Sequence, residues 1–256
     1  MTTLWSCEAI GTISAITMTD QNKKYSQMWT HFFQFLNPVE SNKSDLMYWK
    51  WGEIQNFDWT LNSDLKVKVE VELEIAKNRI IDLSSQTNDM IASPDDAACV
   101  EVEGEKLWLP KKILSFHSPF FSTFFHGDFK EKATDSYSLK EVTLIEFRHF
   151  MALIYNMDVP IDEDSVSYLL RIGDMYQCQS IVQQCHVFLK STDSESMDVE
   201  EMIRLADRYS FLFLLKTSIQ KMPIGKLKEF MRSGDHNKLS DHARGLLFER
   251  LLQEDC

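Results

Sequence analysis

The segment Leu65–Ile75 reads LKVKVEVELEI and alternates strictly between apolar and charged side chains. Successive side chains of a β-strand point to opposite faces, so this alternation predicts a long strand with one buried face and one solvated face. Upstream, Cys7–Met18 and Tyr25–Leu36 have the composition of strands, and the polar residues Asp20–Lys24 predict the turn between them. Residues 1–76 are therefore predicted to form an antiparallel β region.

Residues 77–94 are mostly polar and end at a proline, a composition typical of a linker between domains. Beyond this linker, Cys99–Glu103 and Lys106–Leu109 flank Gly104, which predicts a β-hairpin. The hairpin marks the start of a second domain.

Helices follow the hairpin. Lys111–Ser118 and Phe120–Phe125 are predicted to be short helices separated by Pro119, because proline disfavours helix in the residue before it. A short strand is predicted at Tyr137–Val142, and Thr143 is expected to cap the helix that comes next.

The C-terminal part contains an internal repeat. Residues 165–176 read SVSYLLRIGDMY, and residues 198–209, at an offset of 33, read DVEEMIRLADRY. A second predicted helix follows each copy, at Ser180–Leu189 and at Leu212–Met222. Two copies are too few for a stable solenoid, so they predict a pair of stacked helical hairpins appended to a larger domain.

Composition narrows the function classes. The 256 residues include 27 Lys and Arg against 39 Asp and Glu, a formal net charge of −12, and 44% are hydrophobic. This is the composition of a folded globular protein, and the acidic balance disfavours nucleic acid as a partner. The sequence has neither an apolar run long enough to span a membrane nor the pattern of a signal peptide, so no membrane partner is expected.

The five cysteines are an odd number at wide spacings, which indicates a reducing compartment and predicts an intracellular protein, cytoplasmic or nuclear. Cys178, Cys185 and His186 are the nearest approach to a metal cluster. Their spacing places both cysteines on one helical face, which favours core packing over zinc, and neither a metal nor a cofactor is expected. The chain also lacks the common nucleophile, phosphate-binding and zinc-protease motifs, so it is not predicted to be an enzyme.

The run Asp95–Lys132, DDAACVEVEGEKLWLPKKILSFHSPFFSTFFHGDFKEK, carries a family resemblance. Its opening Asp, its VEG turn and its K-x-I-L-x-x-x-S-P-F-F-x-x-F-F pattern resemble the BTB/POZ domain, and the later Ile154–Asn156 fits the same plan. The resemblance assigns residues 95–190 to a BTB/POZ fold, a helical cluster flanked by a small sheet, and residues 191–256 to a helical extension. The fold class is therefore α+β.

The β region before the linker resembles the C-terminal half of a MATH (TRAF-like) domain, in the order of Trp5, the turn at Asp20–Lys24, the aromatic cluster and the long strand. A MATH domain is an antiparallel sandwich, and residues 1–76 are enough for only part of one. An incomplete sandwich leaves a sheet edge or an inner face uncovered. Two explanations remain open: the chain is a truncated product, or a partner or second copy completes the strands.

MATH–BTB proteins are adaptors that recruit substrates to cullin-RING E3 ubiquitin ligases, so the resemblance implies this function, with a cullin, an unknown protein substrate and a second copy of the chain as partners. A BTB-mediated scaffold or transcriptional co-regulator without a ligase role is the alternative. An enzyme is a remote third.

The resemblance also implies three groups of site residues. The cullin-binding group is Phe129, Lys130 and Glu131, in an apolar-x-acidic triplet, with added contact from the helices of residues 191–222. The dimer interface pairs a charge with an opposite charge and adds apolar side chains; its residues are Asp96, Lys111, Ile113, Leu114 and Phe116. The substrate-binding group is the aromatic cluster Tyr48, Trp49 and Trp51, for which core packing is the competing interpretation.

Overall fold

The computed structural model describes residues 2–17, 24–36, 67–127, 136–191 and 197–254. The chain divides into two compact units, and each is described by itself. Unit 1 comprises Met1–Leu114 and Ser122–Val159, and unit 2 comprises Ser115–Phe121 and Pro160–Cys256.

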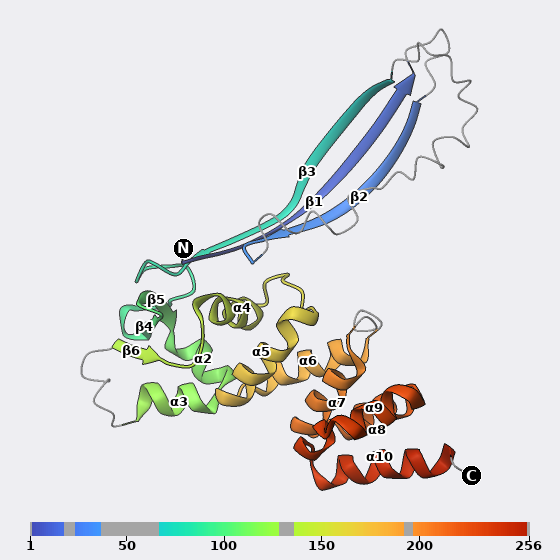
Figure 1. The fold of residues 1–256 in the computed structure, drawn as a ribbon. Coiled ribbons are helices and arrows are strands. Elements are labelled where there is room, and N and C mark those ends of the chain that lie inside the picture. Colours follow the sequence, from blue (N-terminus) through green and yellow to red (C-terminus); the bar gives the residue numbers. More distant parts are fainter. Residues whose placement is uncertain (1, 18–23, 37–66, 128–135, 192–196, 255–256) are drawn as a thin grey trace. The chain divides into compact units, whose positions relative to one another are not determined.

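Three long antiparallel strands open unit 1 (Figure 1): β1 (Thr3–Thr17), β2 (Lys24–Gln34) and β3 (Val67–Asp82). Their order in the sheet is β2-β1-β3, so β1 is central. The register between β1 and β3 shifts at Glu8/Ala9, where a β-bulge interrupts an otherwise continuous ladder. The three predicted strands are thus confirmed, but β3 continues to Asp82, well past its predicted end at Ile75 and into the predicted linker.

The prediction that the apolar face of this strand is buried is wrong for the residues whose side chains are described. Val71, Leu73 and Ile75 are 60%, 58% and 61% exposed. The cause is the number of layers: the described residues of this region form one three-stranded sheet, so a MATH-like sandwich is not confirmed. Alternation reports which side chains share a face, and a second layer is needed to bury that face.

The second sheet of unit 1 is small. It contains β4 (Ala97–Val102), β5 (Glu105–Pro110) and β6 (Ser136–Leu139), in the order β5-β4-β6, with β5 antiparallel and β6 parallel to β4. Glu103 and Gly104 join β4 to β5 with φ values of 51° and 82°. Left-handed backbone at both turn residues is what a tight two-residue hairpin requires, which confirms the predicted hairpin.

The helices that follow are α2 (Lys111–His117), α3 (Pro119–His126) and α4 (Leu144–Ile154), with a 3₁₀ turn at Pro94–Asp96 before β4. Helix α4, the start of α2 and the end of α3 belong to unit 1, whereas Ser115–Phe121 belong to unit 2. The predicted cap at Thr143 is present as a complete capping box with Glu146. On α4, Phe147, Phe150 and Met151 are fully buried and contribute to the core.

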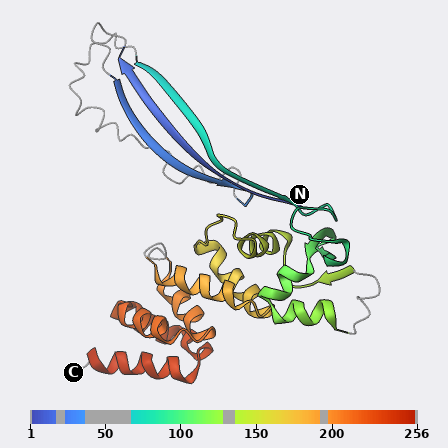
Figure 2. The same cartoon turned by 180° about the vertical axis from the view of Figure 1, so that it is seen from behind.

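Unit 2 is helical (Figure 2). Its helices are α5 (Glu163–Met175), α6 (Gln179–Lys190), α7 (Val199–Arg208), α8 (Leu212–Lys221), α9 (Ile224–Ser233) and α10 (Asp241–Glu254), with a 3₁₀ turn at Asp235–Lys238. Helices α5 and α6 pack together, as do α7 and α8, and these are the two predicted hairpins.

The two hairpins repeat their turn geometry as well as their sequence. The Cys178 amide donates to the Gly173 carbonyl at 2.6 Å, and the Phe211 amide donates to the Ala206 carbonyl at 2.8 Å. The residue before each of these amides, Gln177 or Ser210, is left-handed, with φ of 52° and 57°. Equivalent helix C-caps at an offset of 33 residues confirm the repeat.

Candidate functional site

The start of α2 is organised by Asp96, which is 5% exposed. One oxygen of its carboxylate accepts the backbone amide of Lys112 at 2.9 Å, and the other accepts the amide of Ala92 at 3.4 Å. Free amides at a helix N-terminus favour a negative charge, so Asp96 stabilises the first turn of α2. A capping role within the chain therefore accompanies any role of Asp96 at an interface.

Lys111, the predicted partner of Asp96, is half-buried at the first position of α2. Its ammonium donates to the backbone carbonyl of Asp95 at 3.3 Å. The charged pair predicted for the interface thus lies at the junction between the turn Pro94–Asp96 and α2, and both members contact backbone groups there.

The apolar residues predicted for the interface differ in burial. Leu114 is fully buried and belongs to the core of the chain, whereas Ile113 is half-buried. Phe116 is 84% exposed, and its ring contacts His117 edge to face at a centroid distance of 5.2 Å. A large aromatic side chain this exposed is typical of a surface that a partner covers.

The Ser-Pro-Phe motif fixes the start of α3, which belongs to unit 2. The buried Ser118 hydroxyl accepts the amide of Phe121 at 3.0 Å and donates to the carbonyl of Tyr176. Phe120 and Phe121 then pack on the Tyr176 ring, with centroid distances of 5.2 and 4.9 Å. The motif is therefore a structural joint between α3 and the end of α5.

The cullin-binding triplet Phe129, Lys130 and Glu131 and the aromatic cluster Tyr48, Trp49 and Trp51 lie outside the described residues. In the sequence, the triplet falls between the end of α3 and the start of β6.

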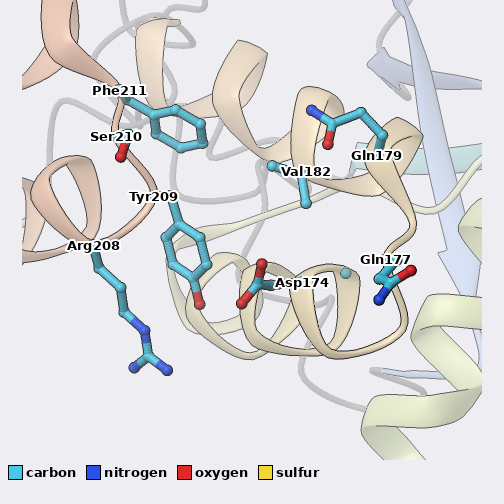
Figure 3. A pocket seen from close by; sticks show the side chains of 9 residues that line it. Asp174, Gln177, Gln179, Val182, Arg208, Tyr209, Ser210 and Phe211 are labelled. Atoms are coloured by element: carbon cyan, nitrogen blue, oxygen red, sulfur yellow. The ribbon is translucent and has the colours of Figure 1, made fainter. Parts of the chain in front are cut away.

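A surface cavity of about 400 Å³ lies between the turns of the two repeated hairpins (Figure 3). The α5–α6 hairpin supplies one wall, with Asp174 and Gln177 among its residues, and the α7–α8 hairpin supplies Tyr209 and Phe211. Tyr209 points across the cavity toward α5. Sequence analysis identified the repeat but missed this cavity, because a space between two hairpins depends on their packing.

Burial shifts the pKa of Tyr209, which lines this cavity, and of His186, which stacks on the lining residue Phe211. Burial raises the pKa of the Tyr209 phenol, and the negative charge of Asp174 adds to this increase. His186 stacks on Phe211 with ring centroids 4.1 Å apart and an interplanar angle of 12°, and burial lowers the pKa of its imidazole. Both shifts favour the uncharged form of the side chain at neutral pH.

The cysteine cluster considered for zinc consists of buried thiols. Cys178 and Cys185 are fully buried, and burial raises the pKa of Cys185 to about 12. A zinc ligand must be a thiolate, which this environment disfavours. Among the described residues, no three Cys, His, Asp or Glu side chains are grouped to hold a metal ion.

No helix within those residues is both long and apolar enough to cross a bilayer.

Comparison with known proteins adds to this geometry. Residues 95–193 match the family model of the BTB/POZ domain. The chain contains a BTB/POZ domain. The match includes the hairpin, the Ser-Pro-Phe joint, helices α2 to α6 and the three-stranded sheet β5-β4-β6, which confirms the family predicted from the motifs.

Similarity extends beyond this domain. BTB and MATH domain-containing protein 38 of Caenorhabditis elegans is 24% identical over 98% of the chain, which spans 64% of that relative's length. Kelch repeat and BTB domain-containing protein 4 of Mus musculus is 31% identical over 43% of the chain and 21% of its own length. Among solved structures, the BTB domain of human gigaxonin is similar at 20% sequence identity and a TM-score of 0.32, and the similarity covers 36% of this chain and 75% of that one.

These relatives indicate a protein-interaction module. The resemblance to BTB and MATH domain-containing proteins covers the β region as well as the BTB/POZ domain. The described fold agrees with this class: mixed helix and sheet, with an exposed aromatic side chain on α2 and a cavity between two helical hairpins.

Proposed function

We propose that the chain is a substrate-recruiting adaptor of a cullin-RING E3 ubiquitin ligase. The observation that carries the proposal is the BTB/POZ domain at residues 95–193, followed directly by a second helical hairpin that repeats the α5–α6 hairpin. In this function the chain holds a protein substrate and a cullin at the same time, and partner enzymes perform the chemistry. It acts where cullin ligases act, in the cytoplasm or the nucleus.

Cullin docking is assigned to the triplet Phe129, Lys130 and Glu131, with added contact from α7 and α8. In such a triplet the aromatic side chain provides affinity by burying apolar area in the partner, and the neighbouring charge fixes the orientation of the complex. The cavity beside Tyr209 gives the helical extension a recess for a partner side chain.

Dimerisation is assigned to the start of the domain and to α2, through Asp96, Lys111, Ile113 and Phe116. Exposure supports Phe116 in particular, since a solvated ring of this size gains free energy when a second copy covers it.

Cullin docking is tested by co-purification with a tagged cullin. The variant Phe129→Ala/Glu131→Ala is expected to lose the cullin. The matched control is Phe248→Ala/Glu249→Ala, because both residues are exposed neighbours on α10. Retention of the cullin by the first variant would contradict docking through the triplet and favour the scaffold or co-regulator function.

Dimerisation is tested by light scattering coupled to size-exclusion chromatography. Phe116→Arg is expected to halve the molar mass, since an arginine cannot occupy an apolar interface without a partner charge. Phe213→Arg is the control, because Phe213 is 71% exposed on α8 and lies outside the proposed interface. An unchanged mass for Phe116→Arg would place the interface elsewhere.

A further inference from the structure

Strand β3 forms one edge of the three-stranded sheet in unit 1. In the order β2-β1-β3, it pairs with β1 from Val67 to Asp82 except at the bulged Ala76, and among the described residues it has no strand on its other side. An unpaired edge presents a row of backbone donors and acceptors that can pair with another chain.

The edge is accessible over a continuous stretch. Every residue from Val71 to Asn78 is exposed. Natural sheets protect long edges by shortening them, bending them away or placing lysines on them. Strand β3 carries Lys68, Lys77 and the bulge at Ala76, but the stretch Val71–Ile75 contains neither a lysine nor a bulge, so it is open to an added strand.

The two faces of this edge differ in chemistry. On one face Val71, Leu73 and Ile75 are each more than half exposed and make an apolar row. On the other face Glu72 and Glu74 are exposed and make an acidic row. The apolar row and the acidic row are together called the β3 edge.

The basic residues that follow are used within the chain, so they do not neutralise the acidic row. Lys77 pairs with Asp158, and Arg79 donates to the backbone carbonyls of Tyr155 and Asn156. The acidic character of the β3 edge therefore rests on Glu72 and Glu74.

We propose that the β3 edge binds an extended segment of a partner protein in which apolar and basic residues alternate. Such a segment adds a strand to the sheet: its backbone pairs with β3, its apolar side chains lie beside Val71, Leu73 and Ile75, and its Lys or Arg side chains lie beside Glu72 and Glu74. Backbone pairing provides affinity, and the alternating side chains provide specificity.

A second copy of the chain fits this edge poorly. In a two-fold antiparallel pair of β3 strands centred anywhere from Glu70 to Glu74, at least one glutamate lies opposite another glutamate or itself. Like charges directly opposite one another destabilise a strand pair. A partner rich in Lys or Arg removes this conflict, so charge complementarity selects a basic partner.

This inference deepens the proposed function, since it names a substrate class for the adaptor, and it rests on that function only in calling the partner a substrate. Binding of the segment requires neither cullin nor dimer. The two ideas can therefore fail separately: the peptide experiment below contains no cullin, and cullin co-purification is measured on the same variants and is expected to stay unchanged.

The test measures binding of a fluorescein-labelled decapeptide of alternating Lys and Val to the full chain by fluorescence anisotropy. Two peptides are the controls: a block peptide of the same composition, with all Lys before all Val, and an alternating Glu and Val peptide. The alternating Lys peptide is expected to bind at least about tenfold more tightly than either control. Alternate amides of a bound peptide point toward β3, and the others point away. Two N-methylated versions of the alternating Lys peptide, one methylated at the odd residues and one at the even residues, are therefore compared, and only one of them is expected to lose binding.

Reversing the charge of the acidic row separates loss of binding from loss of folding. Glu72→Lys/Glu74→Lys is expected to lose the alternating Lys peptide and to gain the alternating Glu peptide. Asp164→Lys/Glu249→Lys carries the same change of net charge at two exposed positions of unit 2 and is expected to behave like the natural chain. A gain of binding cannot come from unfolding.

Three results would overturn the proposal. Equal binding of the alternating and block peptides would show attraction by charge alone. Lack of binding to all peptides would show that the edge is closed, for example by another part of the same chain. Self-association that Glu72→Lys/Glu74→Lys changes would assign the edge to a second copy.

Discussion

The guanidinium of Arg148 lies over the ring of Phe35, 4.4 Å from its centroid. Arg148 comes from α4, and Phe35 directly follows β2, so the contact joins the BTB/POZ domain to the β region within unit 1. The same guanidinium donates to the carbonyl of Thr3, at the start of β1. Both side chains are buried, and burial lowers the pKa of Arg148, which nevertheless stays charged at neutral pH.

Arg79 makes a second attachment near the end of β3. Its guanidinium donates to the carbonyls of Tyr155, at 3.1 Å, and Asn156, directly after α4. Carbonyls at a helix C-terminus lack intrahelical partners and favour a positive charge. The β region is thus attached to α4 at two places: at Arg148, on the buried face of the helix, and at the Tyr155 carbonyl, at its C-terminus.

The first prediction concerns Arg148→Ala. The variant loses a charged hydrogen bond and a cation–π contact, so the free energy of unfolding is expected to fall by about 1–3 kcal/mol. Hydrogen exchange should accelerate at β1 and at the end of β2 more than at α7 and α8. Arg148→Lys is expected to recover only part of the loss, because an ammonium does not stack flat on a ring.

Arg232→Ala is the control for this loss, since Arg232 is exposed at the end of α9. Its unfolding free energy should stay within about 0.5 kcal/mol of the natural chain. If Arg148→Ala matched this control, the attachment of the β region would not depend on Arg148.

The sequence predicted local structure better than it predicted contacts. Thr143 and Glu146 are three residues apart, so the capping box could be read directly from the pattern. Arg148 and Phe35 are far apart in the sequence, and neither has a local pattern that announces a contact. The alternation in Leu65–Ile75 predicted a strand correctly, but burial of its apolar face depends on a second layer that no local pattern specifies.

The candidate site shows the same division. The pattern of Lys111–Ser118 located α2, whereas the capping contact from Asp96 to Lys112 depends on the path of the chain before the helix. Similarly, the repeat could be identified from the sequence, but the cavity beside Tyr209 arises from the packing of one hairpin on the next.

The second prediction separates two roles of Asp96. Asp96→Asn keeps an oxygen that can accept the amide of Lys112, but removes the charge. It is expected to weaken the dimer while the free energy of unfolding of the chain falls by less than about 1 kcal/mol. Asp96→Ala removes the acceptor as well, and should cost about 1–2 kcal/mol more, because it leaves a helix amide unsatisfied.

Dimer dissociation, measured by analytical ultracentrifugation, and urea unfolding at fixed protein concentration distinguish the two variants. A dimer of natural strength in Asp96→Asn would restrict Asp96 to capping and contradict its charged role at the interface.

The third prediction uses the left-handed residues of the repeated turns. Ser210 has φ of 57°, which costs free energy for any residue with a Cβ. Ser210→Gly is therefore expected to raise the free energy of unfolding by about 0.5–1 kcal/mol, and Gln177→Gly should act in the same direction. Thermal unfolding followed by circular dichroism measures both.

Ser167→Gly, within helix α5, supplies a control of opposite sign, because glycine in a helix interior is less favourable than serine by about 0.5 kcal/mol. Gly173→Ala probes the packing of the same hairpin. A Cβ there would lie 3.1 Å from a methyl of Val182, so this variant should be destabilised even though alanine favours helix. Stabilisation by Gly173→Ala would mean that α5 and α6 are less closely packed.

The fourth prediction concerns the ion pair between Asp198, the N-cap of α7, and Lys226 on α9. The hydrogen bond from Lys226 lowers the pKa of the Asp198 carboxyl below its ordinary 3.8, and the bond to Asp198 raises the pKa of Lys226 above its ordinary 10.5. A lowered carboxyl pKa contributes stability above pH 3.8 that is lost as the pH falls through the lowered value; a raised ammonium pKa contributes stability below pH 10.5 that is lost as the pH rises through the raised value.

Lys226→Met should therefore lower the unfolding midpoint at neutral pH, and the difference from the natural chain should shrink as the pH falls below 3.8 and vanish once Asp198 is protonated in both. Added salt should shrink the neutral-pH difference, because both groups are partly solvated. Lys216→Met, at an exposed position of α8, is the control and should give a small difference that does not vary with pH. A Lys226→Met effect that persisted unchanged at low pH would assign it to the packing of the lysine stem on the helix and not to its charge.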